Sequence, residues 1–520
     1  MFIDFLIALT YNGNMKNNIK LNALQGTKLV FALIILLFTS QCFAESSIEK
    51  SSRLSNYQYI RNFQSIFNFV QQNYVDELDS QVLYEGALKG MMDAIGDPYT
   101  VYLDSDSMRD LTDTTAGNFG GVGLSISKPM ESKPGKPAYV EVATPIEDTP
   151  GFRAGIQSGD QIIAIDEKPT DKMTMNDVLA NLRGEVGAPV TIKILRGESM
   201  VFDVTLVREL IEVPTVKYGM VEGTKIGYVR LIQFTPDTAP RLQDALDSFE
   251  KEGYESLIID LRDNPGGLLD SAVAVVDKFI DEGPIVSTKS RLAFENQQFS
   301  ATKKGTTVSK DIPIVVMINK GSASASEIVS GALKDYHRAY LVGERTYGKG
   351  SVQQVIPLSN IEGLKMTVAR YYTPSDTNID KIGIPPDFEV TNIEKFTEEQ
   401  EKVYVDFLTS NIIEETVDKN PNMSEAEIAA AAKEIVKTYP FDQRLIRRML
   451  RVQVQRHMEA PLFDKDFDLQ LHAAIDVLKN KDFENLLKNT KTLKQLQDEA
   501  VAAEDAENTE EKNIAGSETK

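Results

Sequence analysis

Cysteine, tryptophan and histidine are scarce in this 520-residue sequence, which has one cysteine, no tryptophan and three histidines. A single cysteine cannot form a disulfide within the chain, and it excludes zinc or iron–sulfur sites built from several cysteines. The sequence also has no phosphate-binding glycine loop and no cluster of metal ligands. We therefore expect a protein that uses no metal and no other cofactor.

Positive charge is limited as well. The chain has 56 lysine and arginine residues against 77 aspartate and glutamate residues, a formal net charge of -21. Proteins that bind nucleic acid usually carry a basic face that neutralises phosphates, so we expect no nucleic-acid partner. Hydrophobic residues make up 42% of the sequence, enough for buried cores. A chain of this length is expected to form about two to four domains.

The first 44 residues have the pattern of an export signal. Lys16, Lys20 and Lys28 precede an apolar run at 29–38, and Cys42 and Ala44 are small residues of the kind that a signal peptidase accepts. We expect cleavage after Ala44 and a periplasmic protein. The alternative is a retained membrane anchor, which is disfavoured because the apolar run is short for a bilayer.

The initiator methionine and the only cysteine both lie in this segment. The residues before Met15 lack the basic start of a signal, so either Met1 or Met15 is the initiator. Gln41 is too large for the position before a lipidated cysteine, so we expect no lipid on Cys42. Because Cys42 is the only cysteine, the mature chain would have none, which suits an oxidising compartment.

Helical periodicity marks the region 45–104. One predicted helix has apolar residues at steps of three and four, and a second is predicted from Gln81 to Ile95. This region is either a helical lid that packs on the next domain or a dimer contact. The apolar face consists of Ile60, Phe63, Phe67, Val70 and Tyr74.

The region 393–496 is also predicted to be helical, and the small, acidic and polar residues at 497–520 predict a disordered tail. Five arginines crowd one helical segment of this region. They form either a solvated helix face or a docking or dimer surface. These residues are Arg444, Arg447, Arg448, Arg451 and Arg456.

Short strands and turns dominate 105–210. We expect strands at 139–142, 161–165, 190–195 and 202–206, and a helix from Met175 to Leu182. A glycine-flanked loop at 120–123 can turn its amides onto a carboxylate while the next strand exposes an edge. Together with the Gly159-Asp160 turn and the strand after it, this loop resembles a PDZ domain; an ordinary hairpin-rich domain is the alternative. The resemblance implies that a peptide's terminal carboxylate binds the amides of Gly121, Val122, Gly123 and Leu124.

Strands and helices alternate over 211–392, which indicates an α/β core. Strands are expected at 226–234, 256–261 and 313–318, and helices at 240–252 and 268–280. The second strand enters its helix through Pro265, Gly266 and Gly267. Such a junction bares backbone amides that can bind an anion or stabilise an oxyanion, although a plain tight turn is the alternative.

A turn of small residues, GSASASE at 321–327, follows the strand at 313–318 and leads into a helix that ends at Asp335. A serine at this junction would have an exposed hydroxyl beside helix amides, which is the geometry of a nucleophile next to an oxyanion hole. The alternative is that these serines only cap the helix. Capping accounts for one serine, but not for a turn whose positions are all small enough to admit a substrate backbone.

Histidine does not supply a base for such a nucleophile. His457 and His472 lie in the C-terminal helical region, and His337 is expected at the surface. A lysine whose pKa falls on desolvation can accept a serine proton near neutral pH. Lys349 lies between two glycines, which would let it approach the serine turn closely.

The segments SASASE and GKGSVQQ resemble the carboxyl-terminal processing (tail-specific) peptidase family. The resemblance covers roughly 57–390 and includes LRDNPGG and the segment GIPPD at 383–387. It implies that Ser324 is the nucleophile, that Lys349 is the general base, and that Gln353 orients the lysine amine. Ser322 and Ser326 are the nearest rivals of Ser324. The implied oxyanion-hole donors are the amide of Ala325 and an amide of Gly266 or Gly267.

One stretch departs from the family pattern. Family members usually have glycine and then arginine after the serine of YYTPS, where this sequence has Asp376 and Thr377. The departure concerns the local loop and the fit of substrate rather than the dyad.

The sequence therefore predicts an exported serine endopeptidase of α/β (α+β overall) fold. A PDZ domain at 105–210 would precede an α/β protease core at 211–392, with helical regions on both sides. The partners would be protein or peptide substrates with accessible C-termini, an adaptor protein, and further copies of the chain bound through the terminal helices; membrane association is a further expectation. Two alternatives stay open: an inactive peptide-binding scaffold, and a structural partner in an envelope complex.

Overall fold

The computed structural model describes residues 55–502, except 130–131, 133–136, 147–148, 158, 198, 393–395, 456–460 and 480–481. The chain divides into two compact units, Met1–Leu88 and Lys89–Lys520. The predicted signal, with its start at Met1 or Met15 and its cleavage after Ala44, lies outside the described residues. No helix within the described ranges is long and apolar enough to cross a membrane.

In the first unit, the predicted N-terminal helix is α3 (Asn56–Asn73), and the second is α4 (Ser80–Asp93), which crosses the unit boundary. Ser55 and Gln58 form a capping box that fixes the start of α3. No residue of α3 is buried, and Ile60 and Phe63 keep 68% and 51% of their surface exposed. The predicted apolar face thus lies on a regular helix and remains accessible.

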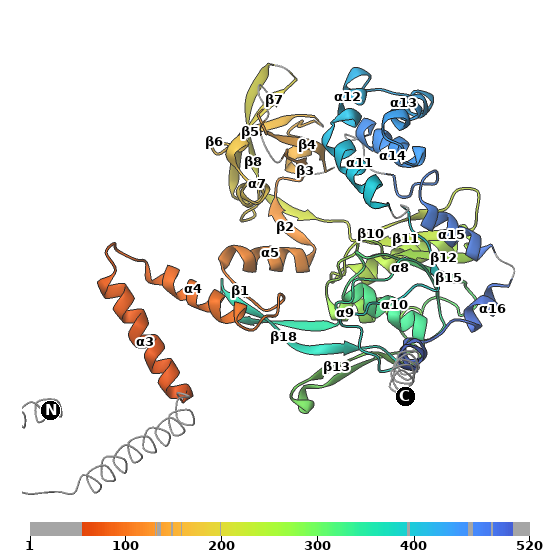
Figure 1. Ribbon diagram of the computed structural model, residues 1–520, viewed down its shortest axis with the longest axis horizontal. Coiled ribbons are helices and arrows are strands. Elements are labelled where there is room, and N and C mark those ends of the chain that lie inside the picture. Colours follow the sequence, from red (N-terminus) through yellow and green to blue (C-terminus); the bar gives the residue numbers. More distant parts are fainter. Residues whose placement is uncertain are drawn as a thin grey trace, which may run out of the picture. The chain divides into compact units, whose positions relative to one another are not determined.

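A six-stranded sheet lies at the centre of the second unit (Figure 1). The first two strands in the order pair antiparallel, and all later neighbours pair parallel. This alternation of parallel strands with helices confirms the predicted α/β class. The strands in spatial order are β10 (Val216–Met220), β11 (Ile226–Leu231), β12 (Ser256–Asp260), β15 (Ile314–Ile318), β16 (Tyr340–Gly343) and β19 (Phe388–Glu389).

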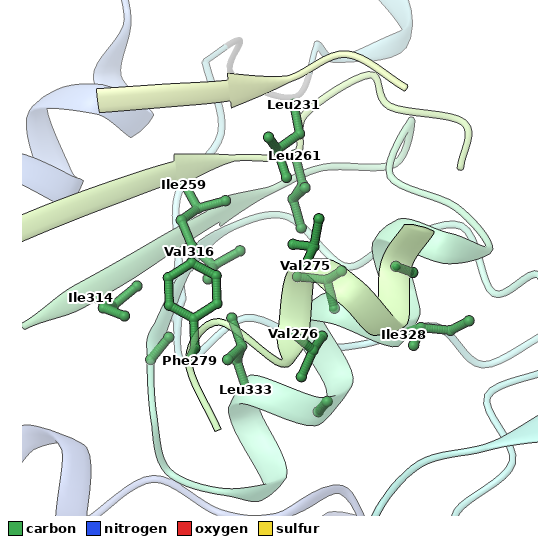
Figure 2. Packing of buried hydrophobic residues seen from close by; sticks show 14 of the residues in the cluster. Leu231, Ile259, Leu261, Val275, Val276, Phe279, Ile314, Val316, Ile328 and Leu333 are labelled. Carbon is green, nitrogen blue, oxygen red and sulfur yellow. The ribbon is translucent and has the colours of Figure 1, made fainter. Parts of the chain in front are cut away.

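Helices cover both faces of this sheet because its central strands are buried on both sides. On one face, Ile259 and Val316 pack with Phe279 and Leu333, as Figure 2 shows. On the other face, Ile258 and Val315 belong to a second cluster with residues of α15 and α16. The helices are α8 (Thr238–Glu252), α9 (Leu269–Val276) and α10 (Ala325–Asp335) at the first cluster, and α15 (Leu469–Leu478) and α16 (Phe483–Lys488) at the second.

A second, antiparallel sheet of the same unit was not predicted. Its strands follow the order β1–β18–β13–β14, and β17 pairs with β18. The central strands were predicted from continuous apolar runs. β17 and β18 have no such run, because most of their residues are half-buried and need not be apolar. The strands are β1 (Val101–Leu103), β13 (Gly283–Ser290), β14 (Gln297–Ala301), β17 (Ser351–Pro357) and β18 (Gly363–Tyr372).

The region after α5 (Ser105–Ala116) forms a separate small sheet in the order β3–β4–β5–β7–β8, and β2 (Asn118–Gly121) pairs with β9 (Glu209–Glu212). The helix α7 has the predicted bounds, Met175–Leu182. Its Val178 and Leu182 pack with Val122 in the hydrophobic cluster of this sheet. The six strands are β3 (Leu124–Ser127), β4 (Val140–Pro145), β5 (Gln161–Ile165), β6 (Lys168–Pro169), β7 (Pro189–Arg196) and β8 (Met200–Val207), and β6 pairs with β5.

Four C-terminal helices enclose a hydrophobic cluster of their own. They are α11 (Glu398–Thr409), α12 (Ile412–Lys419), α13 (Glu425–Thr438) and α14 (Gln443–Val454). Three arginines of α14 form ion pairs within the chain. Arg444 pairs with Asp442, and Arg447 and Arg451 both pair with Glu425 and lie over the ring of Phe467. Arg456 is outside the described residues. A helix also covers 493–502, so the segment predicted as a disordered tail from 497 begins as helix. Ion pairs such as Lys494–Asp498 stabilise that helix.

Candidate active site

The two predicted active-site loops leave the sheet side by side. β12 and β15 are parallel neighbours, and the Leu261 amide continues their ladder by donating to the Met317 carbonyl (2.9 Å). Loops at the carboxyl ends of adjacent parallel strands form the usual crevice of an α/β sheet. The glycine loop after β12 and the serine turn after β15 are therefore direct neighbours.

Ser322 and Ser326 bind the serine turn to the glycine loop. The Ser322 hydroxyl donates to the Leu261 carbonyl (2.8 Å), and the Ser326 hydroxyl donates to the Asn264 carbonyl (2.9 Å). The Ala323 amide donates to the same Asn264 carbonyl (3.0 Å). Both serines are fully buried. Their hydroxyls therefore have structural roles and are poor candidates for a nucleophile.

Ser324 differs from these two serines. Its backbone has φ of 55°, a region that costs energy for a residue with a side chain and that recurs at functional sites. Ser324 and Glu327 form a capping box at the start of α10, and the Glu327 amide donates to the Ser324 carbonyl (2.8 Å). The Ser324 side chain lies beside the Tyr371 hydroxyl. Unlike the hydroxyls of Ser322 and Ser326, the Ser324 hydroxyl donates to no backbone carbonyl among the described residues.

Two backbone amides beside Ser324 have no acceptor in the described part of the chain, those of Ala325 and Gly267. The Gly266 amide, in contrast, donates to Asn264 Oδ1 (2.9 Å). Gly266 has a different constraint: a Cβ there would lie 2.8 Å from Ser324 Cβ. Gly266 therefore provides the close approach to Ser324, and Gly267 is the better placed of the two glycines to donate to an anion.

The Lys349 amine does not contact Ser324. Its Nζ lies 4.8 Å from the centre of the Tyr99 ring, and no hydrogen bond joins it to Ser324 Oγ among the residues that the structure describes. Burial and the positive charge of Lys365 lower the pKa of the Lys349 amine, while the Glu327 carboxylate opposes that shift. A lowered pKa increases the neutral fraction of the amine, which is the form that accepts a proton.

Gln353 forms no hydrogen bond with the lysine amine among the described residues. Its side-chain amide donates to the hydroxyls of Ser351 (2.9 Å) and Thr367 (3.2 Å). The register of β17 against β18 shifts between Val352 and Gln353. The structure thus brings the glycine loop and Ser324 together. It ties the Lys349 backbone to the turn through Glu327, while the Lys349 amine lies over Tyr99 and the Gln353 amide bonds to Ser351 and Thr367.

The profile of peptidase family S41 matches residues 225–390, that of a PDZ domain matches 141–196, and that of the N-terminal domain of the activating protease CtpB matches 24–107. The carboxy-terminal-processing protease of Bartonella bacilliformis is 41% identical over 365 residues, which are 69% of this chain and 81% of that relative. The chain belongs to the carboxy-terminal-processing protease family. It is a serine-type peptidase with a PDZ domain ahead of the S41 domain.

Two further proteins are similar to this chain over about two thirds or more of its length. The carboxy-terminal processing protease CtpA of Bacillus subtilis is 32% identical over 376 residues, 72% of this chain and 77% of that relative. Among solved structures, a photosystem II D1 C-terminal processing protease is 30% identical and covers 65% of this chain and 94% of its own, with a TM-score of 0.38.

The glycine-flanked loop at 120–123 of the PDZ domain is the loop predicted to bind a peptide's terminal carboxylate. Within the described residues, the amides of Val122 and Gly123 have no acceptor, whereas the carbonyls of both residues accept backbone bonds from Gly151 and Ile146. Gly123 has φ of 72°, and a Cβ there would lie 2.1 Å from the Thr149 side chain. The loop therefore holds two free amides on a backbone that requires glycine.

The departure from the family pattern at Asp376 preserves the local turn. Asp376 has φ of 60°, a left-handed conformation that glycine adopts freely and aspartate tolerates. Its carboxylate pairs with Lys289, whose amine also lies over the Tyr372 ring (4.1 Å). Thr377 is buried, and its carbonyl accepts from the Thr373 amide (3.1 Å). An ion pair thus supports the turn in place of the usual glycine.

Three residues beside the site were not predicted: Tyr99, Glu327 and Tyr371. Glu327 ends the SASASE motif, so its position was visible, but its partners come from a loop later in the chain. Tyr99 is far away in sequence and has no pattern that marks it. His337 is half-buried against Thr490 at the far end of α10, which excludes it as the base for Ser324. Within the described ranges, no His, Cys, Asp or Glu side chains gather as a metal site.

Proposed function

We propose that this protein is an exported endopeptidase that cleaves peptide bonds through a Ser324–Lys349 dyad. Lys349 takes the hydroxyl proton as Ser324 Oγ attacks the substrate carbonyl, and the amides of Ala325 and Gly267 bind the developing oxyanion. The C–N bond then breaks as Lys349 returns the proton to the leaving amine. A water molecule, deprotonated by Lys349, hydrolyses the acyl-enzyme and releases Ser324.

One observation carries this proposal. Within the described residues, Ser324 is the one serine of the turn whose hydroxyl donates to no backbone carbonyl, and it lies beside two amides that have no acceptor there. A nucleophile has to be free of structural bonds, and an oxyanion hole has to have unused donors. The lowered pKa of Lys349 supports its assignment as the base.

The PDZ domain is proposed to capture the C-terminus of a protein or peptide substrate. The carboxylate would bind the amides of the loop from Gly121 to Leu124, and the peptide would extend β3 as an added strand. We further propose that the first 44 residues direct export and are cleaved after Ala44. We also propose that the protein binds an adaptor and that copies of the chain associate through their terminal helices. The exposed apolar face of α3 supports this self-association.

Capture of substrate is proposed to assemble the dyad. The Lys349 amine lies over Tyr99, Ser324 contacts Tyr371, and Gln353 bonds to Ser351, so three groups of the site have other partners. We propose that binding of a peptide releases Lys349 toward Ser324 and lets Gln353 orient the amine.

Replacing Tyr99 by leucine is expected to raise the rate of peptide cleavage by about tenfold. A cation–π contact contributes roughly 0.5–2 kcal/mol, and its loss would increase the fraction of Lys349 that is free to reach Ser324. The initial rate on a short peptide that lacks a PDZ-binding end measures this effect. Tyr99→Phe is the matched control because it keeps the ring, so it should match the wild type. A Tyr99→Leu enzyme that is no faster would exclude Tyr99 as a latch.

The proposed function is tested with purified Ser324→Ala and an unfolded protein substrate. We expect a folded variant without proteolysis, which retains the uncut substrate through its PDZ domain. Ser322→Ala is the matched control; it loses a structural bond but should keep measurable activity. Proteolysis by Ser324→Ala at the wild-type rate would exclude Ser324 as the nucleophile and favour the alternative of a catalytically silent scaffold.

A further inference from the structure

The carboxylate of Glu327 lies between the nucleophile turn and the lysine loop. Glu327 is the third residue of α10 and has no exposed surface. Its Oε2 accepts from the amides of Ser324 (2.9 Å) and Lys349 (2.8 Å). Its Oε1 accepts from the amide of Gly348 (2.7 Å) and the hydroxyl of Thr346 (2.6 Å). One carboxylate thus joins the two loops that hold the proposed catalytic groups.

The four partners of this carboxylate are all donors. An ionised carboxylate has about four lone-pair sites and can accept all of them, whereas an amide or a protonated acid cannot. Thr346 is itself fixed, because its hydroxyl accepts from the Ile384 amide (2.6 Å) while it donates to Glu327. Burial raises the pKa of the Glu327 carboxyl, and the four donors oppose that shift because they bind the charged form. The hydrogen bonds therefore favour a charged group at this position.

We infer that Glu327 is a positioning residue that fixes the distance between the backbone of Ser324 and the backbone of Lys349. This inference rests on the proposed Ser324–Lys349 dyad. The two backbones are held by the same oxygen, Oε2, so the motion that brings the Lys349 amine to Ser324 takes place in the side chain alone. Glu327 contacts no reacting atom, and it acts through the residues that do.

A second consequence of the arrangement is electrostatic. The charged groups that face the Lys349 amine are Glu327 on α10 and Lys365 on β18, and the Tyr99 phenol has a pKa of about 12 and is neutral. The Glu327 charge raises the pKa of Lys349, and Lys365 lowers it. Removal of the Glu327 charge would therefore lower the pKa of the lysine. A buried carboxylate that stabilises α10 without facing the Lys349 amine, such as Asp387, would not produce this shift.

The test is Glu327→Gln in the full-length protein, with two readouts. The kcat for a peptide should fall about 100-fold with KM nearly unchanged, since small displacements of catalytic groups have effects of this size. The pH at which Lys349 becomes reactive, followed by competitive acetylation with acetic anhydride and mass spectrometry, should move to lower pH. The acetylation readout does not depend on catalysis.

Asp387→Asn is the matched control. Asp387 is a second buried carboxylate that binds α10, through Lys334, and it also accepts from the Leu341 amide (2.9 Å). This variant should lose stability without moving the titration of Lys349. If Glu327→Gln does not fold, Thr346→Val removes a single donor of the cluster, and its kcat should fall severalfold with KM unchanged.

The possible outcomes separate this inference from the proposed function. Wild-type kcat and an unchanged Lys349 titration in Glu327→Gln would overturn the inference, and so would a loss of kcat accompanied by no shift of the titration. Proteolysis by a Lys349 variant at the wild-type rate would overturn the dyad itself.

Discussion

Lys349→Met is expected to lower kcat/KM by about 10³-fold or more while the protein stays folded. A positioned general base contributes about 10²–10⁴-fold, and groups that act as a unit with the nucleophile often contribute more. Methionine keeps the length and the apolar stem of lysine over Tyr99 but cannot accept a proton. The backbone bond from residue 349 to Glu327 is also preserved. Steady-state cleavage of a fluorogenic peptide measures the effect, and circular dichroism verifies the fold.

Lys365→Met is the matched control for this prediction. Lys365 is a neighbouring lysine on β18 whose charge lowers the pKa of Lys349. Its removal should raise that pKa and shift the acidic limb of the pH profile to higher pH, because a smaller fraction of Lys349 is then neutral at a given pH. The plateau rate should remain. If Lys349→Met and Lys365→Met have equal activity, Lys349 is not the base.

The second large effect is on stability. Arg262→Leu is expected to lower the free energy of unfolding by about 3–5 kcal/mol, because it leaves a buried carboxylate without its partner. The Asp260 side chain is fully buried and bonds to Arg262 Nη2 (2.7 Å) and to the Tyr228 hydroxyl (2.6 Å). The same guanidinium bonds to Asp468 (2.7 Å) ahead of α15. Urea denaturation monitored by circular dichroism measures the loss.

The pH dependence of this stabilisation has a defined direction. Burial alone would raise the pKa of Asp468, but the hydrogen bonds and charge of Arg262 outweigh it and hold that pKa below its usual range. The stabilisation is therefore present above the pKa of the unfolded state and is lost as the pH falls through the lower folded value. The difference between wild type and Arg262→Leu should accordingly shrink in acid.

Arg241→Leu is the matched control on the surface. Arg241 pairs with Glu212 (2.7 Å), but their side chains keep 36% and 64% of their surface exposed, so the loss should be below about 1 kcal/mol. Equal losses in the two arginine variants would show that the buried network of Arg262 contributes no more than a surface pair.

The parts of the fold that could be predicted were those with a strong local signal. The buried runs of β12 and β15 and the amphipathic turns of α7 predicted those elements close to their observed bounds. The hairpin of β17 and β18 was missed because its residues are half-buried and alternate weakly. Burial of such strands depends on which neighbour pairs with them, and a single strand does not reveal its neighbour.

The candidate site shows the same limit. The small residues before a helix pointed to the serine turn, and the family resemblance selected Ser324 within it. The residue pattern alone could not separate Ser324 from Ser322 and Ser326. That distinction depends on hydrogen bonds to carbonyls of a loop about sixty residues earlier in the chain. Likewise, the contact of Lys349 with Tyr99 depends on tertiary structure, since no spacing rule connects two residues so far apart.

The most direct test of the dyad is to locate the acylated residue. The wild type, Ser324→Ala and Lys349→Met are incubated with a peptide whose C-terminus binds the PDZ domain and with a fluorophosphonate, which reacts irreversibly with activated serines. The labelled residue is identified by mass spectrometry. We predict a single label on Ser324 in the wild type, and no label at the same exposure in either variant. A label on Ser322, on Ser326 or elsewhere in the wild type, or full labelling of Ser324 in Lys349→Met, would contradict the Ser324–Lys349 dyad.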